Sequence, residues 1–204
     1  MRPRGRGKEL RLTILGIDPG SVVTGLGLIV RSGRKVRLVH GDCLRVPVGE
    51  PFEKRLLYLH DALDAFLEAH PADEVSIEAP FYGANVKTLM KMCHARGSLL
   101  AAVARHGIPV FEYAPREIKK SVVGNGNASK DQVAFMVRQA LGDEDFNDEW
   151  PLDVTDAIAT ALCRAHRVGS HPEDDRPAGT MTLADRLMAA GASPETARRV
   201  GGAR

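Results

Sequence analysis

Runs of apolar residues divide the first part of the chain into short strands. The run from Leu12 to Ile17 stops at Asp18, which is followed by Pro19 and Gly20, and this is typical of a buried strand that ends in a turn. Further strands are expected at 24–31 and 35–44. Because only short turns separate these three segments, the pattern predicts an antiparallel meander.

Helical spacing dominates the remainder of the chain. From Phe52 to Phe66 the apolar residues recur every three or four positions, which predicts a helix with one buried face that ends near Pro71. Ser129 and Gln132 have the spacing of a capping box at the start of another helix. Helices are therefore expected at 52–70, 86–105, 116–122, 129–141 and 152–167, and two further strands at 74–77 and 108–113.

The order of these elements predicts an α/β fold. Three antiparallel strands are followed by strands that alternate with helices, and this alternation indicates parallel βαβ connections. We therefore expect a mixed five-stranded sheet with helices on both faces.

The length of 204 residues and a hydrophobic content of 44% are typical of a folded chain with one large domain. We expect residues 12–168 to form that domain. Residues 1–11 have the composition of a basic flexible arm, and residues 169–204 that of a flexible linker and a C-terminal tail to which no role is assigned.

Neither a membrane nor a secreted location is expected. The longest apolar stretch, 99–104, is far shorter than the about 20 residues that span a bilayer. Three scattered cysteines are too few for a disulfide framework or a thiolate zinc site, which favours the reducing cytoplasm.

Charge is distributed unevenly along the chain. Residues 84–138 contain nine basic and three acidic side chains, whereas residues 141–156 contain seven acidic side chains and no basic one. A basic surface beside an acidic cluster is the distribution expected of a metal-dependent nuclease. Solvated helix faces and loops produce the same pattern, so the charge alone does not decide between them.

Four acids occupy positions at which ligands commonly bind. Asp18 ends the first strand and Glu78 the fourth, and ligands of open α/β sheets gather at the carboxyl ends of strands. Asp153 and Asp156 are three residues apart and share one helix face. Four convergent carboxylates would bind Mg²⁺ or Mn²⁺.

The same acids also have ordinary structural interpretations. Asp18 before Pro-Gly is a common turn residue, and Asp153 with Asp156 could cap a helix or complement its dipole. Glu78 follows a short buried strand directly and has no capping role, so a structural interpretation suits it less well.

Five ordered blocks between about residues 12 and 167 resemble the RuvC family of Holliday-junction resolvases. The blocks are LGIDPG at 15–20, TG at 24–25, EAPF at 78–81, VVGNG at 122–126 with Ser129-Lys130, and DVTDA at 153–157. The resemblance implies an RNase H-like fold and a homodimer. It also implies metal-dependent hydrolysis of DNA strands at four-way junctions, in homologous recombination and DNA repair, and cooperation with a branch-migration motor complex.

The resemblance also implies roles for individual residues. Asp18, Glu78, Asp153 and Asp156 match the catalytic, metal-binding acids of the family. The DNA-binding candidates are an aromatic residue at the junction centre (Phe81), a weaker aromatic candidate beside it (Tyr82), two lysines near the scissile phosphate (Lys119 and Lys130) and one further lysine (Lys87). Two Mg²⁺ or Mn²⁺ ions per site, bridged by Asp18 from the central strand, would then activate water and stabilise the leaving 3′ oxygen.

Two other functions are considered. Residues 18–21 followed by 24–27 also resemble the first phosphate loop of actin-like sugar kinases, but those proteins need a second such domain, which 204 residues do not supply. A non-catalytic binder of branched DNA would keep the basic residues but would not need four acids. The acids therefore favour a nuclease.

Overall fold

The computed structural model describes residues 11–47, 49–80, 85–142, 146–147, 149–169 and 177. Its strands are β1 (Arg11–Asp18), β2 (Val23–Ser32), β3 (Lys35–Arg45), β4 (Glu74–Glu78) and β5 (Val110–Tyr113). Its helices are α1 (Phe52–Ala69), α2 (Val86–Arg105), α3 (Pro115–Val123), α4 (Lys130–Leu141) and α5 (Leu152–Arg167). Each predicted element is confirmed, with ends that differ by at most two residues.

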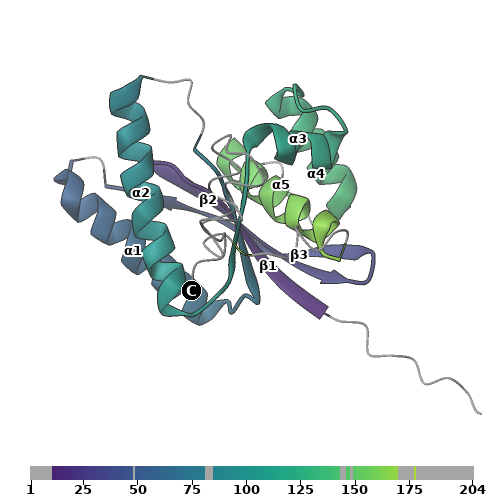
Figure 1. The fold of residues 1–204 in the computed structure, drawn as a ribbon, viewed down its shortest axis with the longest axis horizontal. Coiled ribbons are helices and arrows are strands. Elements are labelled where there is room, and N and C mark those ends of the chain that lie inside the picture. Colours follow the sequence, from purple (N-terminus) through teal and green to yellow (C-terminus); the bar gives the residue numbers. More distant parts are fainter. Residues whose placement is uncertain are drawn as a thin grey trace, which may run out of the picture.

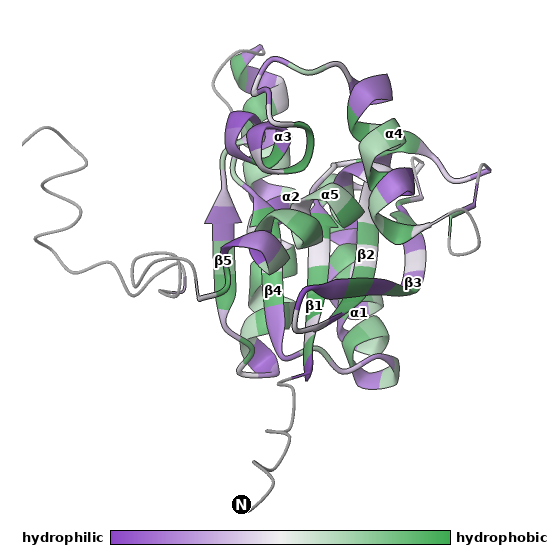
Figure 2. Cartoon of the chain, turned by 90° about the vertical axis from the view of Figure 1, so that its right-hand side faces the viewer, coloured by the Kyte–Doolittle hydropathy of each residue, from purple (hydrophilic) through white to green (hydrophobic). Residues whose placement is uncertain are grey.

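The five strands form one mixed sheet in the order β3-β2-β1-β4-β5. Strand β1 pairs antiparallel with β2 and parallel with β4, β2 pairs antiparallel with β3, and β4 pairs parallel with β5. Strand β3 lies at the edge, and hydrophilic and hydrophobic residues alternate along it, whereas the strands at the centre of the sheet are mostly hydrophobic (Figure 2). This topology is the predicted meander followed by parallel βαβ connections.

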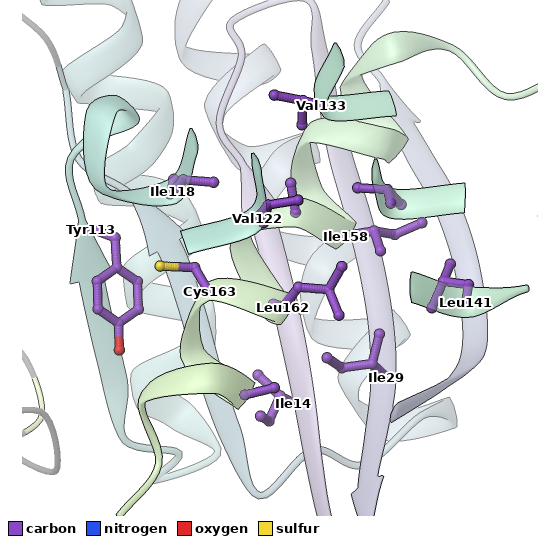
Figure 3. Close-up of a cluster of buried hydrophobic side chains, with 14 of the residues drawn as sticks. Ile14, Ile29, Tyr113, Ile118, Val122, Val133, Leu141, Ile158, Leu162 and Cys163 are labelled. Carbon is purple, nitrogen blue, oxygen red and sulfur yellow. The ribbon is translucent and has the colours of Figure 1, made fainter. Parts of the chain in front are cut away.

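Helices cover both faces of the sheet. Figure 1 shows α1 and α2 on one side and α3, α4 and α5 on the other. Side chains of α1 and α2, such as Leu63 and Leu99, pack on Leu15, Ile17 and Ile77 of the sheet. The second core lies between the sheet and α3 to α5, where Ile14 and Ile29 meet Ile158 and Leu162 (Figure 3). Among the described residues, no helix is long and apolar enough to span a membrane.

Helix α5 lies unusually close to the sheet because glycines line the strands beneath it. A Cβ atom on Gly16 would lie 1.9 Å from the backbone oxygen of Ala157, and one on Gly25 would lie 1.9 Å from the backbone oxygen of Asp153. Any side chain at these positions would push the helix away from the sheet. The glycines thus determine the height at which the first turn of α5 crosses the end of the sheet.

A buried ion pair holds the other end of α5. Arg164 is only 2% exposed, and its Nε and Nη2 atoms donate to the two carboxylate oxygens of Glu74 at 2.7 and 3.0 Å. The guanidinium also stacks on the ring of Phe111, 3.5 Å from the ring centroid. Because Glu74 begins β4, this pair ties the C-terminal part of α5 to the sheet.

Parts of two predicted segments lie outside the described residues. These are residues 1–10 of the predicted basic arm, and residues 170–176 and 178–204 of the predicted linker and tail.

Candidate active site

Asp18 and Glu78 end neighbouring parallel strands at the same level. Ile17 pairs with Ile77 in the register of β1 and β4, so the acids that follow them lie side by side at the carboxyl edge of the sheet. The two isoleucines are buried on the side of α1 and α2. Because successive side chains on a strand point to opposite faces, Asp18 and Glu78 are directed to the α5 side.

Helix α5 adds two acids at its start. Asp18 pairs with Gly25 in the sheet, and the backbone of Asp153 passes directly over that glycine. The charges of Asp153 and Asp156 both raise the pKa of Asp18, so both lie within electrostatic reach of it. The close approach of α5 to the sheet therefore brings Glu78, Asp153 and Asp156 all within electrostatic reach of Asp18.

A cleft of about 200 Å³ opens between the sheet edge, α3, α4 and α5. It is lined by Asp18, Glu78, Pro115, Ile118, Lys119, Lys130, Val133, Asp156 and Ala159. Three carboxylates and two lysines thus face one space, on a floor of apolar side chains. Asp153 is not among the residues that line the cleft.

The two strand-end acids are poorly compensated as carboxylates. Burial, followed by the charges of Glu78 and Asp156, raises the pKa of Asp18 to about 8. Burial, followed by the charge of Asp156, raises the pKa of Glu78 to about 7. The cluster of acids therefore has more negative charge than its surroundings neutralise.

Two lysines supply part of the missing positive charge. The Nζ atom of Lys130, in the first turn of α4, lies 2.6 Å from Oδ2 of Asp156. This hydrogen bond is the main cause that raises the pKa of Lys130. The charge of Lys119 lowers the pKa of Glu78, which puts its ammonium group within electrostatic reach of the cleft acids.

The donor atoms of the site fit a hard divalent cation. All the acidic ligands offer oxygen, and buried carboxylates without enough positive charge are the environment in which such an ion is stabilised. Asp18, Glu78 and Asp156 would hold it, with Asp153 beside them. As the side chains stand, no three His, Cys, Asp or Glu residues within the described ranges are grouped to hold one ion. A cation on Asp156 would therefore compete with the ammonium group of Lys130.

The other DNA-binding candidates are not brought to this cleft. Lys87 is exposed at the start of α2, where its backbone N–H donates to the side chain of the capping residue Asn85 at 2.9 Å. It is not among the residues that line the cleft. Phe81 and Tyr82 lie outside the described residues.

Sequence reasoning did not identify Arg55, which supports the loop after Asp18. The guanidinium of Arg55, on α1, donates to the backbone oxygen of Ser21. Thr24 closes the same loop by accepting from the N–H of Gly20 at 3.2 Å and donating to its carbonyl oxygen at 3.0 Å. No sequence signal marks Arg55, because its partner is a backbone atom 34 positions away.

Comparison with known proteins identifies relatives over most of the chain. The family described as crossover junction endodeoxyribonuclease RuvC matches residues 14–164. The RuvC protein of Salinibacter ruber is 38% identical over 174 residues, which cover 85% of this chain and 96% of the relative. That of Legionella pneumophila is 42% identical over 153 residues, which cover 75% and 86%.

A solved structure of similar fold is that of T. thermophilus RuvC in complex with Holliday junction substrate. It superposes with a TM-score of 0.74 at 30% sequence identity, and the match covers 81% of this chain and 99% of that chain. The predicted RNase H-like fold is thereby confirmed.

Proposed function

The chain belongs to the RuvC family of crossover junction endodeoxyribonucleases, and on that premise we propose that it resolves four-way DNA junctions by paired nicks at the acidic cleft. The observation that carries this proposal is the convergence of Asp18, Glu78 and Asp156 with Lys119 and Lys130 on one cleft. The solved T. thermophilus relative was in complex with a Holliday junction, which supports the same substrate class here.

The reaction we propose is hydrolysis of a DNA phosphodiester bond. Nucleases of this family depend on a divalent metal ion, and we propose Mg²⁺ or Mn²⁺, two ions per site, held by Asp18, Glu78, Asp153 and Asp156. When bound, such ions supply an activated water molecule and stabilise the charge on the leaving oxygen. The carboxylates hold their positions because strand ends and a closely packed helix fix them.

The lysines have a different task in this proposal. Lys130 starts α4, whose N-terminal N–H groups favour an anion nearby. Its ammonium group is bonded to Asp156, and a phosphate that enters the cleft offers it a second anionic partner. Lys119 lies on the same cleft wall. Together the two lysines would orient the scissile phosphate over the acids.

We propose that the enzyme acts as a homodimer through α2. Val86 and Met90 are 57% and 56% exposed, and Cys93 is also exposed. These residues are spaced by four and three positions and so form one apolar stripe on the helix. A second copy that covers this stripe would give two equivalent sites, which match the two equivalent strands of a four-way junction.

The domain, the cellular setting and the DNA contacts complete the proposal. We assign the activity to a domain of residues 12–168, acting in the cytoplasm together with a branch-migration motor complex. Cys43 and Cys93 are free thiols, which agrees with a reducing compartment. Phe81, Tyr82 and Lys87 remain proposed DNA contacts.

Cleavage and binding assays on matched substrates test the proposal. A mobile four-way junction and a linear duplex of equal length are each incubated with the protein and Mg²⁺ or Mn²⁺. We expect the junction to be nicked and to be bound in preference to the duplex at about 0.15 M salt, because phosphate contacts alone carry no shape information. Binding without nicking would favour a non-catalytic binder, and equal cleavage of both substrates would favour a nonspecific nuclease.

A further inference from the structure

A second groove adjoins the acidic cleft. It has a volume of about 410 Å³ and is lined by Pro115, Arg116, Lys119, Gly126 and Asn127. Pro115 and Lys119 line both spaces. The groove and the acidic cleft therefore meet at these two residues. The volume is within the range of pockets that bind small molecules.

The loop that forms one wall of the groove is held rigidly. Gly124 adopts a positive φ of 82°, and the side chain of Asn125 accepts a hydrogen bond from the backbone N–H of Asn127 at 3.0 Å. A Cβ atom on Gly126 would lie 3.1 Å from the backbone oxygen of Arg116, so the loop packs directly against the start of α3. The backbone segments that carry Asn127 and Arg116 are thus packed against each other.

The polar groups in the groove are available to a ligand. Arg116 and Asn127 are exposed, and within the described part of the chain neither the guanidinium nor the side-chain amide has an ion pair or hydrogen bond. Arginine donates two hydrogen bonds to N7 and O6 of guanine, and asparagine pairs with N7 and N6 of adenine. Both residues therefore match the edge of a purine.

We propose that this groove is a nucleobase subsite, in which Arg116 and Asn127 read a purine next to the scissile phosphate. The two residues would then set the sequence preference of cleavage, whereas the acids perform the hydrolysis. This inference rests on the proposed junction cleavage and adds to it the residues that determine where along the DNA the nick falls.

The test is cleavage of a pool of four-way junctions whose central base pairs are randomised, followed by sequencing of the nicked ends. The wild-type protein should prefer a purine at one position beside the nick. Arg116→Ala and Asn127→Ala should each reduce that preference by about five- to 100-fold, the discrimination that one good side-chain contact to a base provides. Nicking of the pool as a whole should continue.

Asn127→Asp sharpens the test because it conserves the shape of the side chain. A carboxylate only accepts hydrogen bonds, and cytosine offers an amino donor, so the preference should shift from purine towards cytosine. The control is Arg34→Ala, which removes one exposed charge from the turn between β2 and β3. This control should keep the wild-type preference.

The outcomes separate this inference from the proposed function. An unchanged preference in Arg116→Ala and Asn127→Ala overturns the subsite, and so does an equal loss of nicking at every sequence. Absence of nicking of the pool by the wild-type protein overturns the proposed function itself.

Discussion

Replacing Asp18 by asparagine should abolish nicking and, at the same time, stabilise the metal-free protein. Asn conserves the shape of the side chain but cannot ionise, whereas Asp18 is buried beside three other carboxylates. Burial and these neighbours raise the pKa of Asp18 from 3.8 to about 8. The folded state therefore resists ionisation of this group, whereas the unfolded state does not, and the difference opposes folding at neutral pH.

The size of the effect follows from the pKa. Each pKa unit corresponds to about 1.4 kcal/mol. Because pH 7 lies about three units above the ordinary pKa of Asp18, its raised pKa destabilises the folded wild type at pH 7 by about 4 kcal/mol. The amide of the variant must also be desolvated, which offsets part of this gain. We expect the free energy of unfolding to rise by about 1–3 kcal/mol, and Tm by about 2–10 °C for a chain of this length.

The pH dependence gives the sign of the effect. Below pH 3.8 Asp18 is protonated in both states, so wild type and variant should differ little. In the wild type, the free-energy cost that Asp18 adds to folding grows as pH rises towards about 8. The reason is that Asp18 ionises at a lower pH in the unfolded state than in the folded state. Thermal unfolding in a chelator at pH 4, 6 and 8 should therefore show a Tm difference that widens with pH, and added Mg²⁺ should narrow it.

Glu68→Gln provides the matched control, because Glu68 is an exposed carboxylate on α1 far from the cleft. It should change Tm little at each pH. A Tm of Asp18→Asn that equals or falls below that of the wild type at pH 8 would refute the argument, and so would a difference that does not depend on pH.

Three further changes test the packing and assembly. Arg164→Ala should lower the free energy of unfolding by about 3–5 kcal/mol in denaturant titration, because it leaves Glu74 partly buried without its partner; an effect below about 1 kcal/mol would contradict this. Gly16→Ala should destabilise the fold by about 3 kcal/mol or more and abolish nicking because its Cβ would clash with α5, whereas Gly49→Ala, with open space around it, should not; equal effects would contradict the role of the glycines. Met90→Asp should convert a dimer to a monomer in light scattering, and an unchanged mass would remove α2 from the interface.

The arrangement of strands and helices could be predicted because local spacing determines it. Apolar runs, turn residues and the capping box of Ser129 and Gln132 are all local signals, and the capping box is present with both of its hydrogen bonds. The positions of Asp18 and Glu78 were also predictable, since the carboxyl ends of neighbouring parallel strands meet at one edge.

Contacts between distant residues could not be predicted in the same way. The pairing of Lys130 with Asp156 spans 26 positions, and that of Glu74 with Arg164 spans 90. Both depend on the height and direction of α5, which follow from the glycines beneath it rather than from any pattern along the helix. The groove beside Arg116 was missed because the start of α3 and the loop between α3 and α4 form it only when they pack together.

We propose that the acids at the end of this sheet cut four-way junctions. The most direct test is a map of nicks on all four strands of a mobile junction incubated with Mg²⁺ or Mn²⁺, for the wild type and Glu78→Gln. We expect paired nicks at symmetric positions on two opposite strands for the wild type, and an intact junction that is still bound by Glu78→Gln. Wild-type nicking by Glu78→Gln, or unpaired nicks scattered over all four strands, would contradict it.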